Sequence, residues 1–338
     1  MKLVPVVGRI VRLGFDMIHS GRGQAVCKES HIVGSVAEFF QHLMNGLTLG
    51  GIYALIALGY TMVYGILKFI NFAHGDILMV GAYVGLFVFD GLRGNAPLGV
   101  WTFTAFLIAM LVSMISCAVL GMVIERIAYK PLRKATRLAP LLSAIGVSFI
   151  LSNGAAWMFG TQSRKLAYPF NNDSIVLGGV VITPHQIMIL IVSFVMMIVL
   201  KLFVDKTRMG KAMRATSLDQ DTARLMGINV NQVISLTFAI GSALAAVGGM
   251  LIALDFKVYP TMGTMTGLKA FVAAVVGGIG NITGAMVGGI LLGILETFGV
   301  AIFGIPQGLK DTIAFGILII ILLVKPEGLL GKVEKEKV

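Results

Sequence analysis

The sequence predicts an all-α membrane protein, a polytopic helical bundle of about 8–9 transmembrane segments, some of them re-entrant or broken. The first observation is composition: 57% of the 338 residues are hydrophobic and 13% are charged, whereas soluble domains carry about 25% charged residues. The second is length, because apolar stretches of about 20 residues suit membrane helices and exceed barrel strands. The third is the 42 glycines, since small residues let membrane helices approach closely.

Nine apolar segments are candidate membrane spans. They cover residues 43–66, 69–90, 99–124, 138–160, 183–204, 231–254, 264–280, 282–303 and 309–324. Two are expected to be re-entrant or broken, because 69–90 opens with polar residues and 264–280 runs into the glycine-rich stretch GGIGNITG. Irregular backbone is tolerated at membrane depth only where protein buries it or where it lines water.

The Lys and Arg residues indicate which loops face the cytoplasm. Residues 125–137 and 205–229 are rich in both and are expected to be cytoplasmic, following the positive-inside rule. The segment 161–182 between them is then external, and the charged tail 327–338 is cytoplasmic. The net charge of +11 follows from this loop bias, so no nucleic-acid partner is expected.

Residues 1–37 do not fit this pattern and are treated as an N-terminal extension to a transmembrane domain at 38–326. Their basic residues favour the cytoplasm, whereas the order of the spans places the start of the domain outside. The extension is expected to be dispensable, either as an amphipathic surface helix or as a disordered segment. Cys27 and Cys117 are isolated from each other, and no disulfide framework is predicted.

The polar segment 205–229 predicts a short helix. Ser217, followed three residues later by Gln220, fits a capping box. Acidic residues then fall in the first turn, where the helix dipole favours them, and Gly227 suits the left-handed position that ends helices. The predicted helix covers about 218–226. It is interpreted either as an ordinary loop helix on the membrane or bundle, or as a docking helix for a cytoplasmic partner.

Three polar residues near a membrane boundary are candidates for function, because ionisable groups are costly in a membrane. Asn71, His74 and Asp76 either line the translocation path or contact a substrate ammonium, or else Asn71 and Asp76 cap a broken helix while His74 hydrogen-bonds inside the bundle. Lys269 is expected to extend its side chain toward an interface. One His and one Asp fall short of a usual metal-ligand set, so no metal site is predicted.

A glycine row predicts close helix packing near the second broken segment. Gly280, Gly284 and Gly288 repeat every fourth residue, a spacing that lets helix backbones touch. Asn281 beside them is a candidate cap for a re-entrant turn. Glu296 lies deep in an apolar run and is expected to pair with a Lys or Arg on a neighbouring helix or subunit.

The arrangement A-x-x-x-G-I of Ala223, Gly227 and Ile228, after acidic residues, resembles the coupling loop of ABC-importer permeases. Longer stretches narrow the resemblance to the LivH-type permeases of branched-chain amino acid ABC importers. They are NGLTLGGIYALIALGYTMVYGILKFINFAHGDILMVGAY (45–83), ERIAYKPLR…LAPLLSAIGVSFIL (125–151) and GLKAFVAAVVGGIGNITGAMVGGILLGILE (267–296). The resemblance covers roughly 40–331 and leaves out the N-terminal extension.

The resemblance implies an ABC-importer permease fold in the bacterial inner membrane, with leucine, isoleucine and valine as substrates. It implies three kinds of partner: a paralogous LivM-like permease subunit, two cytoplasmic ABC ATPase subunits, and a periplasmic or surface-tethered substrate-binding protein. The coupling residues it implies are Ser217, Asp219, Ala223, Gly227 and Ile228.

The sequence contains no G-x-x-x-x-G-K-[ST] phosphate-binding motif. ATP is therefore expected to bind to partner subunits, with no cofactor in this chain, and no residue set indicates catalysis. An importer permease for urea, short amides or another small solute remains open, because related permeases share these motifs. An autonomous channel or secondary transporter is the alternative of a different class.

Overall fold

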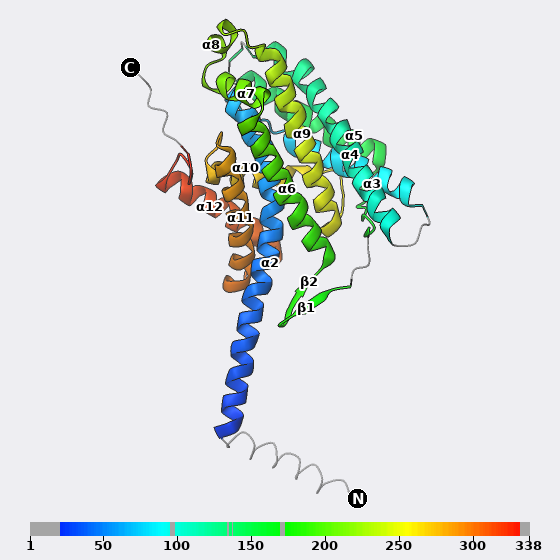
Figure 1. Cartoon of the computed structure of the whole chain (residues 1–338), viewed down its shortest axis with the longest axis vertical. Coiled ribbons are helices and arrows are strands. Elements are labelled where there is room, and N and C mark those ends of the chain that lie inside the picture. The colour runs from blue at the N-terminus through cyan, green and yellow to red at the C-terminus, as the bar shows by residue number, and fades with distance from the viewer. Residues whose placement is uncertain (1–20, 95–98, 134, 137, 170–172, 332–338) are drawn as a thin grey trace, which may run out of the picture.

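The computed structural model describes residues 21–94, 99–133, 135–136, 138–169 and 173–331, which form an elongated helical bundle (Figure 1). Its α-helices are α2 (Gly21–Leu67), α3 (His74–Arg93), α4 (Val100–Ile124), α5 (Leu138–Phe159), α6 (Pro184–Lys206), α7 (Arg208–Leu218), α8 (Gln220–Leu225), α9 (Val230–Asp255), α10 (Met262–Gly277), α11 (Ile282–Phe303) and α12 (Lys310–Val324). Short turns of other helix types cover Glu125–Tyr129, Lys130–Leu132 and Gln307–Leu309. A hairpin joins strands β1 (Ile175–Leu177) and β2 (Val180–Ile182).

The helices confirm a polytopic membrane protein. Within the described residues, seven helices are long and apolar enough to cross a bilayer: parts or all of α2, α3, α4, α5, α6, α9 and α11. The helix α10 has 16 residues, about 24 Å at 1.5 Å per residue, and is shorter than a hydrocarbon core of about 30 Å. The helix α12 is also short, at 15 residues.

Irregular backbone occurs at both predicted breaks. The segment 69–90 becomes an α-helix only at His74, and the preceding turn contains Lys68 in the left-handed region with φ of 55°. The segment 264–280 ends its helix at Gly277, and Gly278 and Gly280 then have φ of 107° and 92°. Glycine adopts this backbone without the steric penalty of a Cβ atom.

The core forms where α2 and α9 pass through the middle of the bundle. The helix α2 packs along α11 and α9, and α9 also packs along α3 and α4. By contrast, α5 lies at the periphery and leaves large apolar side chains such as Phe149 and Trp157 exposed. In a membrane protein, such a face suits lipid or another membrane subunit.

Close glycine contacts hold α11 against two neighbours. A Cβ atom on Gly284 or Gly288 would come within 2.4 Å or 2.2 Å of a carbonyl oxygen of α10. Gly289 and Gly293 make equally close approaches to α2. The predicted packing role fits the geometry of Gly284 and Gly288, whereas Gly280 lies in the turn before α11 and touches nothing closely.

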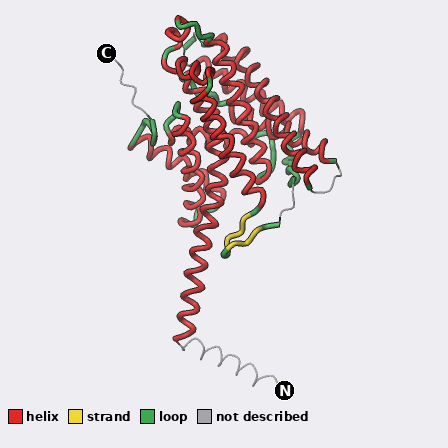
Figure 2. Tube along the Cα trace, in the orientation of Figure 1, coloured by secondary structure: helices red, strands yellow, loops and turns green. Residues whose placement is uncertain are grey.

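The two ends of the bundle are clearly different (Figures 1 and 2). The short helices α7 and α8 lie at one end, and the β1–β2 hairpin lies toward the other, where α2 also extends beyond its neighbours. The segments 205–229 and 161–182 therefore lie toward opposite ends of the bundle, as the predicted topology requires, and the side that each end faces stays a prediction. Following that prediction, we name the end with α7 and α8 the cytoplasmic end and the end with the hairpin the outer end.

The predicted terminal segments are only partly described. From Gly21 onward, the N-terminal extension continues without a break into the first span as one helix, α2, while residues 1–20 lie outside the described residues. The tail begins by packing onto α10, because Leu329 and Leu330 donate backbone hydrogen bonds to Val276 and Gly277 at 2.9 and 3.0 Å. Residues 332–338 lie outside the described residues.

Candidate functional site

The cytoplasmic segment contains two helices, and the predicted capping box at Ser217 is wrong. Ser217 lies in the last turn of α7, where its hydroxyl donates to the carbonyl of Arg214 at 2.7 Å. Asp219 caps α8 instead, because its carboxylate accepts from the backbone N–H groups of Asp221 and Thr222 at 2.8 and 3.2 Å. The cap is two residues later than predicted because α7 continues through Ser217.

The predicted end of this helix at Gly227 is confirmed. Gly227 has φ of 81°, its N–H donates to the Arg224 carbonyl, and the N–H of Ile228 donates to the Ala223 carbonyl, both at 3.0 Å. This pair of bonds is the Schellman arrangement that closes a helix with a left-handed residue. The A-x-x-x-G-I pattern therefore has a local structural cause: it ends α8 and turns the chain toward α9.

The helix α8 is anchored on one side and open on the other. The Gln220 side chain donates to the Ile66 carbonyl at the end of α2, at 2.9 Å, and Ala223 is buried. Leu218, Leu225 and Met226, in contrast, are 83%, 87% and 78% exposed. These exposed apolar side chains at the end of the bundle form a candidate docking surface.

The cap at Asp219 predicts an acid-sensitive turn. The Thr222 hydroxyl, at 2.6 Å, and the two backbone N–H groups hold the pKa of Asp219 below its ordinary value. A lowered pKa in the folded state stabilises the turn above the ordinary Asp pKa of about 3.9, and this stabilisation is lost as pH falls through the lower, folded value. Hydrogen exchange of the Asp221 and Thr222 amides should therefore accelerate, relative to intrinsic rates, only in that acid range.

The matched control for this pH effect is Asp219→Asn, which keeps the acceptor oxygen but does not titrate. Its protection factors at the same two amides should stay flat through the acid range. A parallel loss of protection in the Asn variant would contradict a role for the Asp219 carboxylate.

The polar residues before and within α3 have separate roles. Asn71 accepts from the backbone N–H of Ala73 at 3.1 Å and from the Tyr129 hydroxyl at 2.6 Å, so it stabilises the turn that precedes α3. The His74 ring is buried edge-on against Tyr60, with centroids 4.6 Å apart. The contacts of Asn71 match the cap interpretation. His74 packs inside the bundle, but its Nε2 atom has no hydrogen-bond partner among the described residues, so this packing does not establish the predicted hydrogen bond for His74.

Asp76 has a buried carboxylate with a hydrogen-bond partner for only one of its two oxygens among the described residues. That oxygen accepts from the Ser148 hydroxyl of α5. A cavity of about 630 Å³ adjoins this contact between α5 and the start of α10. Its polar lining includes Ser148, Ser152, Asn153, Thr161 and Thr264. Asp76 is therefore the member of the trio that is linked to a cavity, through its hydrogen-bond partner Ser148.

Glu296 pairs with a buried cation, Lys269. The prediction that the Lys269 side chain extends toward an interface is therefore wrong. Lys269 is 4% exposed and does not reach an interface. Its ammonium lies 2.7 Å from Glu296 and 2.5 Å from Asp311, and the Tyr53 hydroxyl donates to Glu296 at 3.1 Å. The pair forms because α10 and α11 fold back on each other after the break, which brings a Lys and a Glu from separate apolar runs together.

Asn281 sits at the break itself and acts as a cap, as predicted. Its side-chain oxygen accepts from the Gly284 N–H at 3.2 Å, and its amide donates to the Leu330 carbonyl at 2.7 Å. It therefore joins the start of α11 to the tail segment. No group of three His, Cys, Asp or Glu residues that could hold a metal ion occurs within the described ranges.

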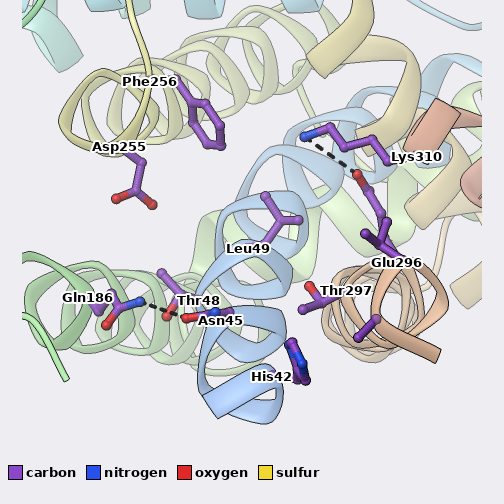
Figure 3. Close-up of a pocket in the computed structure, with 12 residues that line it drawn as sticks. His42, Asn45, Thr48, Leu49, Gln186, Asp255, Phe256, Glu296, Thr297 and Lys310 are labelled. Atoms are coloured by element: carbon purple, nitrogen blue, oxygen red, sulfur yellow. Dashed lines mark hydrogen bonds and ion pairs between the residues drawn. The ribbon is translucent and has the colours of Figure 1, made fainter. Parts of the chain in front are cut away.

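A polar pocket that the sequence did not predict lies toward the outer end (Figure 3). It has a volume of about 340 Å³ and lies between α2, α6, α9, α11 and α12. Its polar lining includes His42, Asn45, Thr48, Gln186, Asp255, Glu296, Thr297 and Lys310. Apart from Glu296, none of these residues was a candidate predicted from the sequence. Asp255 ends α9 and borders the pocket.

Long apolar helices with broken segments between them define a multi-pass membrane protein. Residues 42–322 match the family described as "Branched-chain amino acid transport system / permease component". The chain belongs to this family, which confirms the resemblance predicted from the coupling loop and the longer stretches.

Named relatives cover nearly the same length. The chain is 46% identical over 313 residues to the high-affinity branched-chain amino acid transport system permease protein BraD of Pseudomonas aeruginosa, covering 90% of this chain and 99% of the relative. It is 45% identical over 305 residues to LivH of Escherichia coli K12, covering 89% and 98%. Among solved structures, PsaBC from Streptococcus pneumoniae matches with a TM-score of 0.44 and 13% identity, covering 86% of this chain and 92% of that one.

Proposed function

We propose that this chain is a permease subunit of an ATP-driven ABC importer for leucine, isoleucine and valine in a bacterial inner membrane. The relatives that it matches at 46% and 45% identity are named as branched-chain amino acid permeases. These names support this substrate class over urea, short amides or another small solute.

The proposed assembly has the partners that the resemblance implied. A paralogous LivM-like permease subunit completes the translocation path, and a periplasmic or surface-tethered binding protein delivers the amino acid at the outer end. Two ATPase subunits bind ATP and dock at the cytoplasmic end, so this chain needs no cofactor. Movement of α8 then changes access to the path between the two sides.

The exposed apolar face of α8 is the observation that carries the coupling role. Leu225 and Met226 project from a helix that is fixed at both ends, by the Asp219 cap and by the turn at Gly227. A partner that binds these side chains can displace the whole helix. The hydrogen bond from Gln220 to the Ile66 carbonyl then transmits this displacement to α2. The residues Ser217, Ala223 and Ile228 support this helix from its buried side or its ends.

Asp76 is the residue we place beside the translocation path. It is a buried carboxylate with one unpartnered oxygen next to a hydroxyl-lined cavity, a chemistry suited to a substrate ammonium. Asn71, His74 and Asn281 are assigned to holding the broken segments in place.

The docking role predicts a loss of ATPase binding in the variant Leu225→Asp/Met226→Asp. Two charges on the apolar face should reduce retention of the ATPase subunits during co-purification by about tenfold or more, as removal of central interface side chains does. Uptake of leucine should fall in proportion, while the amount of permease in the membrane stays unchanged.

The matched control is Val176→Asp, which places a charge on a side chain that is also exposed but lies on the outer hairpin. It should leave ATPase retention unchanged. Equal retention of the ATPase by the α8 variant and by this control would rule out α8 as the docking surface.

A further inference from the structure

We propose that the outer pocket binds the free amino acid as a zwitterion, holding its carboxylate at Lys310 and its ammonium at Asp255. This inference rests on the proposed function for the class of substrate, but it concerns a site within this subunit.

The two ends of the pocket carry opposite charges. Figure 3 shows Asp255 and Gln186 on one side of the space, and Lys310 and Glu296 on the other. Leu49 and Phe256 lie between them on the lining. A cavity with an anionic wall, a cationic wall and apolar surface between them complements a small molecule that carries both charges and an aliphatic side chain.

Lys310 is the cation that remains available in this region. The Glu296 carboxylate is already paired with Lys269 at 2.7 Å, whereas the Lys310 ammonium lies 3.9 Å from it. The Lys310 ammonium also lies 5.5 Å from the centre of the Phe256 ring. Glu296, which is almost completely buried, therefore holds Lys310 in place without neutralising it by a direct hydrogen bond.

The Asp255 carboxylate lies on the opposite wall. His185 contacts one of its oxygens at 3.0 Å, and the Asp255 side chain is 24% exposed, so part of the carboxylate is accessible from the pocket that it lines. Beside it, Gln186 donates to Asn45 at 2.9 Å, which fixes two amide groups on the same wall. A carboxylate flanked by oriented amides is a suitable acceptor set for an ammonium group.

The size and place of the pocket fit a waiting site for imported substrate. Its volume of about 340 Å³ lies in the range of small-molecule sites, which combine apolar lining with a few fixed polar groups. It is lined by Gln186 near the start of α6 and Asp255 at the end of α9, and these helix ends lie away from α8 (Figure 1). Lys310, Leu49 and Phe256 also line a second cavity of about 440 Å³ that reaches the buried Lys269.

Cysteine protection in the assembled importer tests the proposal directly. Thr297→Cys, on the pocket lining, is made with Cys27→Ser, while Cys117 is buried and unreactive. A charged methanethiosulfonate is added from outside to the importer in lipid nanodiscs, without the binding protein. At about ten times the half-protecting concentration, leucine should slow modification of this Cys about tenfold.

Two ligand analogues separate the two charged contacts. Leucine amide lacks the carboxylate and 4-methylpentanoate lacks the ammonium, so each should need an about tenfold higher concentration than leucine for half-protection. Lys310→Met and Asp255→Asn should each raise the half-protecting concentration of leucine by a similar factor. Lys165→Met and Asp173→Asn, which change exposed charges elsewhere on the outer side, should not.

A pocket that does not bind amino acids gives a different result. In one such result, leucine would change the modification rate of Thr297→Cys no more than that of Val181→Cys on the exposed hairpin. In another, leucine and both analogues would protect Thr297→Cys at the same concentration. Either outcome overturns the pocket assignment. If the unaltered importer still took up leucine normally, the proposed function would stand even though the pocket assignment was wrong. If the unaltered importer took up no branched-chain amino acid, the proposed function would be wrong.

Discussion

Replacing Lys269 with Met should lower the free energy of unfolding by about 3–5 kcal/mol, the usual effect of removing one member of a buried ion pair. The loss is large because two carboxylates depend on this ammonium, Glu296 at 2.7 Å and Asp311 at 2.5 Å. These contacts join α10, α11 and α12, so the substitution should loosen three helices together. Thermal unfolding of the purified protein in detergent measures the effect.

A second substitution distinguishes lost charge pairing from lost packing. Lys269→Met/Glu296→Gln removes one of the two carboxylates left without their cation, and it should recover a substantial share of the lost stability. Lys257→Met removes an exposed Lys and should change the free energy of unfolding by less than about 0.5 kcal/mol. If Lys269→Met and Lys257→Met unfolded at the same temperature, the buried network would not stabilise the fold.

The same network shows what the sequence alone can and cannot predict. Apolar length located the membrane segments, and the basic loops indicated which end of the bundle each loop occupies, because both signals are local. The partner of Glu296 is not local. Lys269 and Asp311 come from separate helices, and only the fold after the glycine break brings them to one carboxylate.

The coupling segment illustrates a local error. Ser217 and Asp219 are both good helix caps, and the capping-box pattern favoured Ser217. The structure has a second helix, α7, that runs through Ser217, so Asp219 is the first residue whose backbone leaves the helical region and caps α8. The end of α8 was predictable because a left-handed glycine leaves few alternatives.

The outer pocket could not be predicted, because its residues carry no motif. Asn45, Gln186, Asp255 and Lys310 lie in four different helices, and each is typical of the end of a membrane span. These four residues line one pocket only because of how far α2, α6, α9 and α12 extend relative to one another. Such registers follow from side-chain packing along the whole bundle, in particular from the glycine contacts of α11.

The second large effect on stability is expected from substituting one of the glycines of α11 that touch α2. Gly289→Ala should lower the free energy of unfolding by about 1–3 kcal/mol, the range for overpacking a close contact. The added Cβ would lie 2.3 Å from both the Cα and the backbone nitrogen of Ala54 in α2. Backbone atoms cannot rotate away as a side chain does, so α2 and α11 must separate. Thermal unfolding in detergent again measures the result.

Gly316→Ala in α12 is the matched control, because a Cβ at that position meets nothing within 4 Å. There the same substitution should be neutral, or stabilising by up to about 1 kcal/mol through helix propensity. Because α2 also lines the outer pocket, Gly289→Ala should additionally raise the leucine concentration needed to protect Thr297→Cys, and Gly316→Ala should not. Equal stability of the two variants would mean that α2 and α11 are not held in register by direct backbone contact.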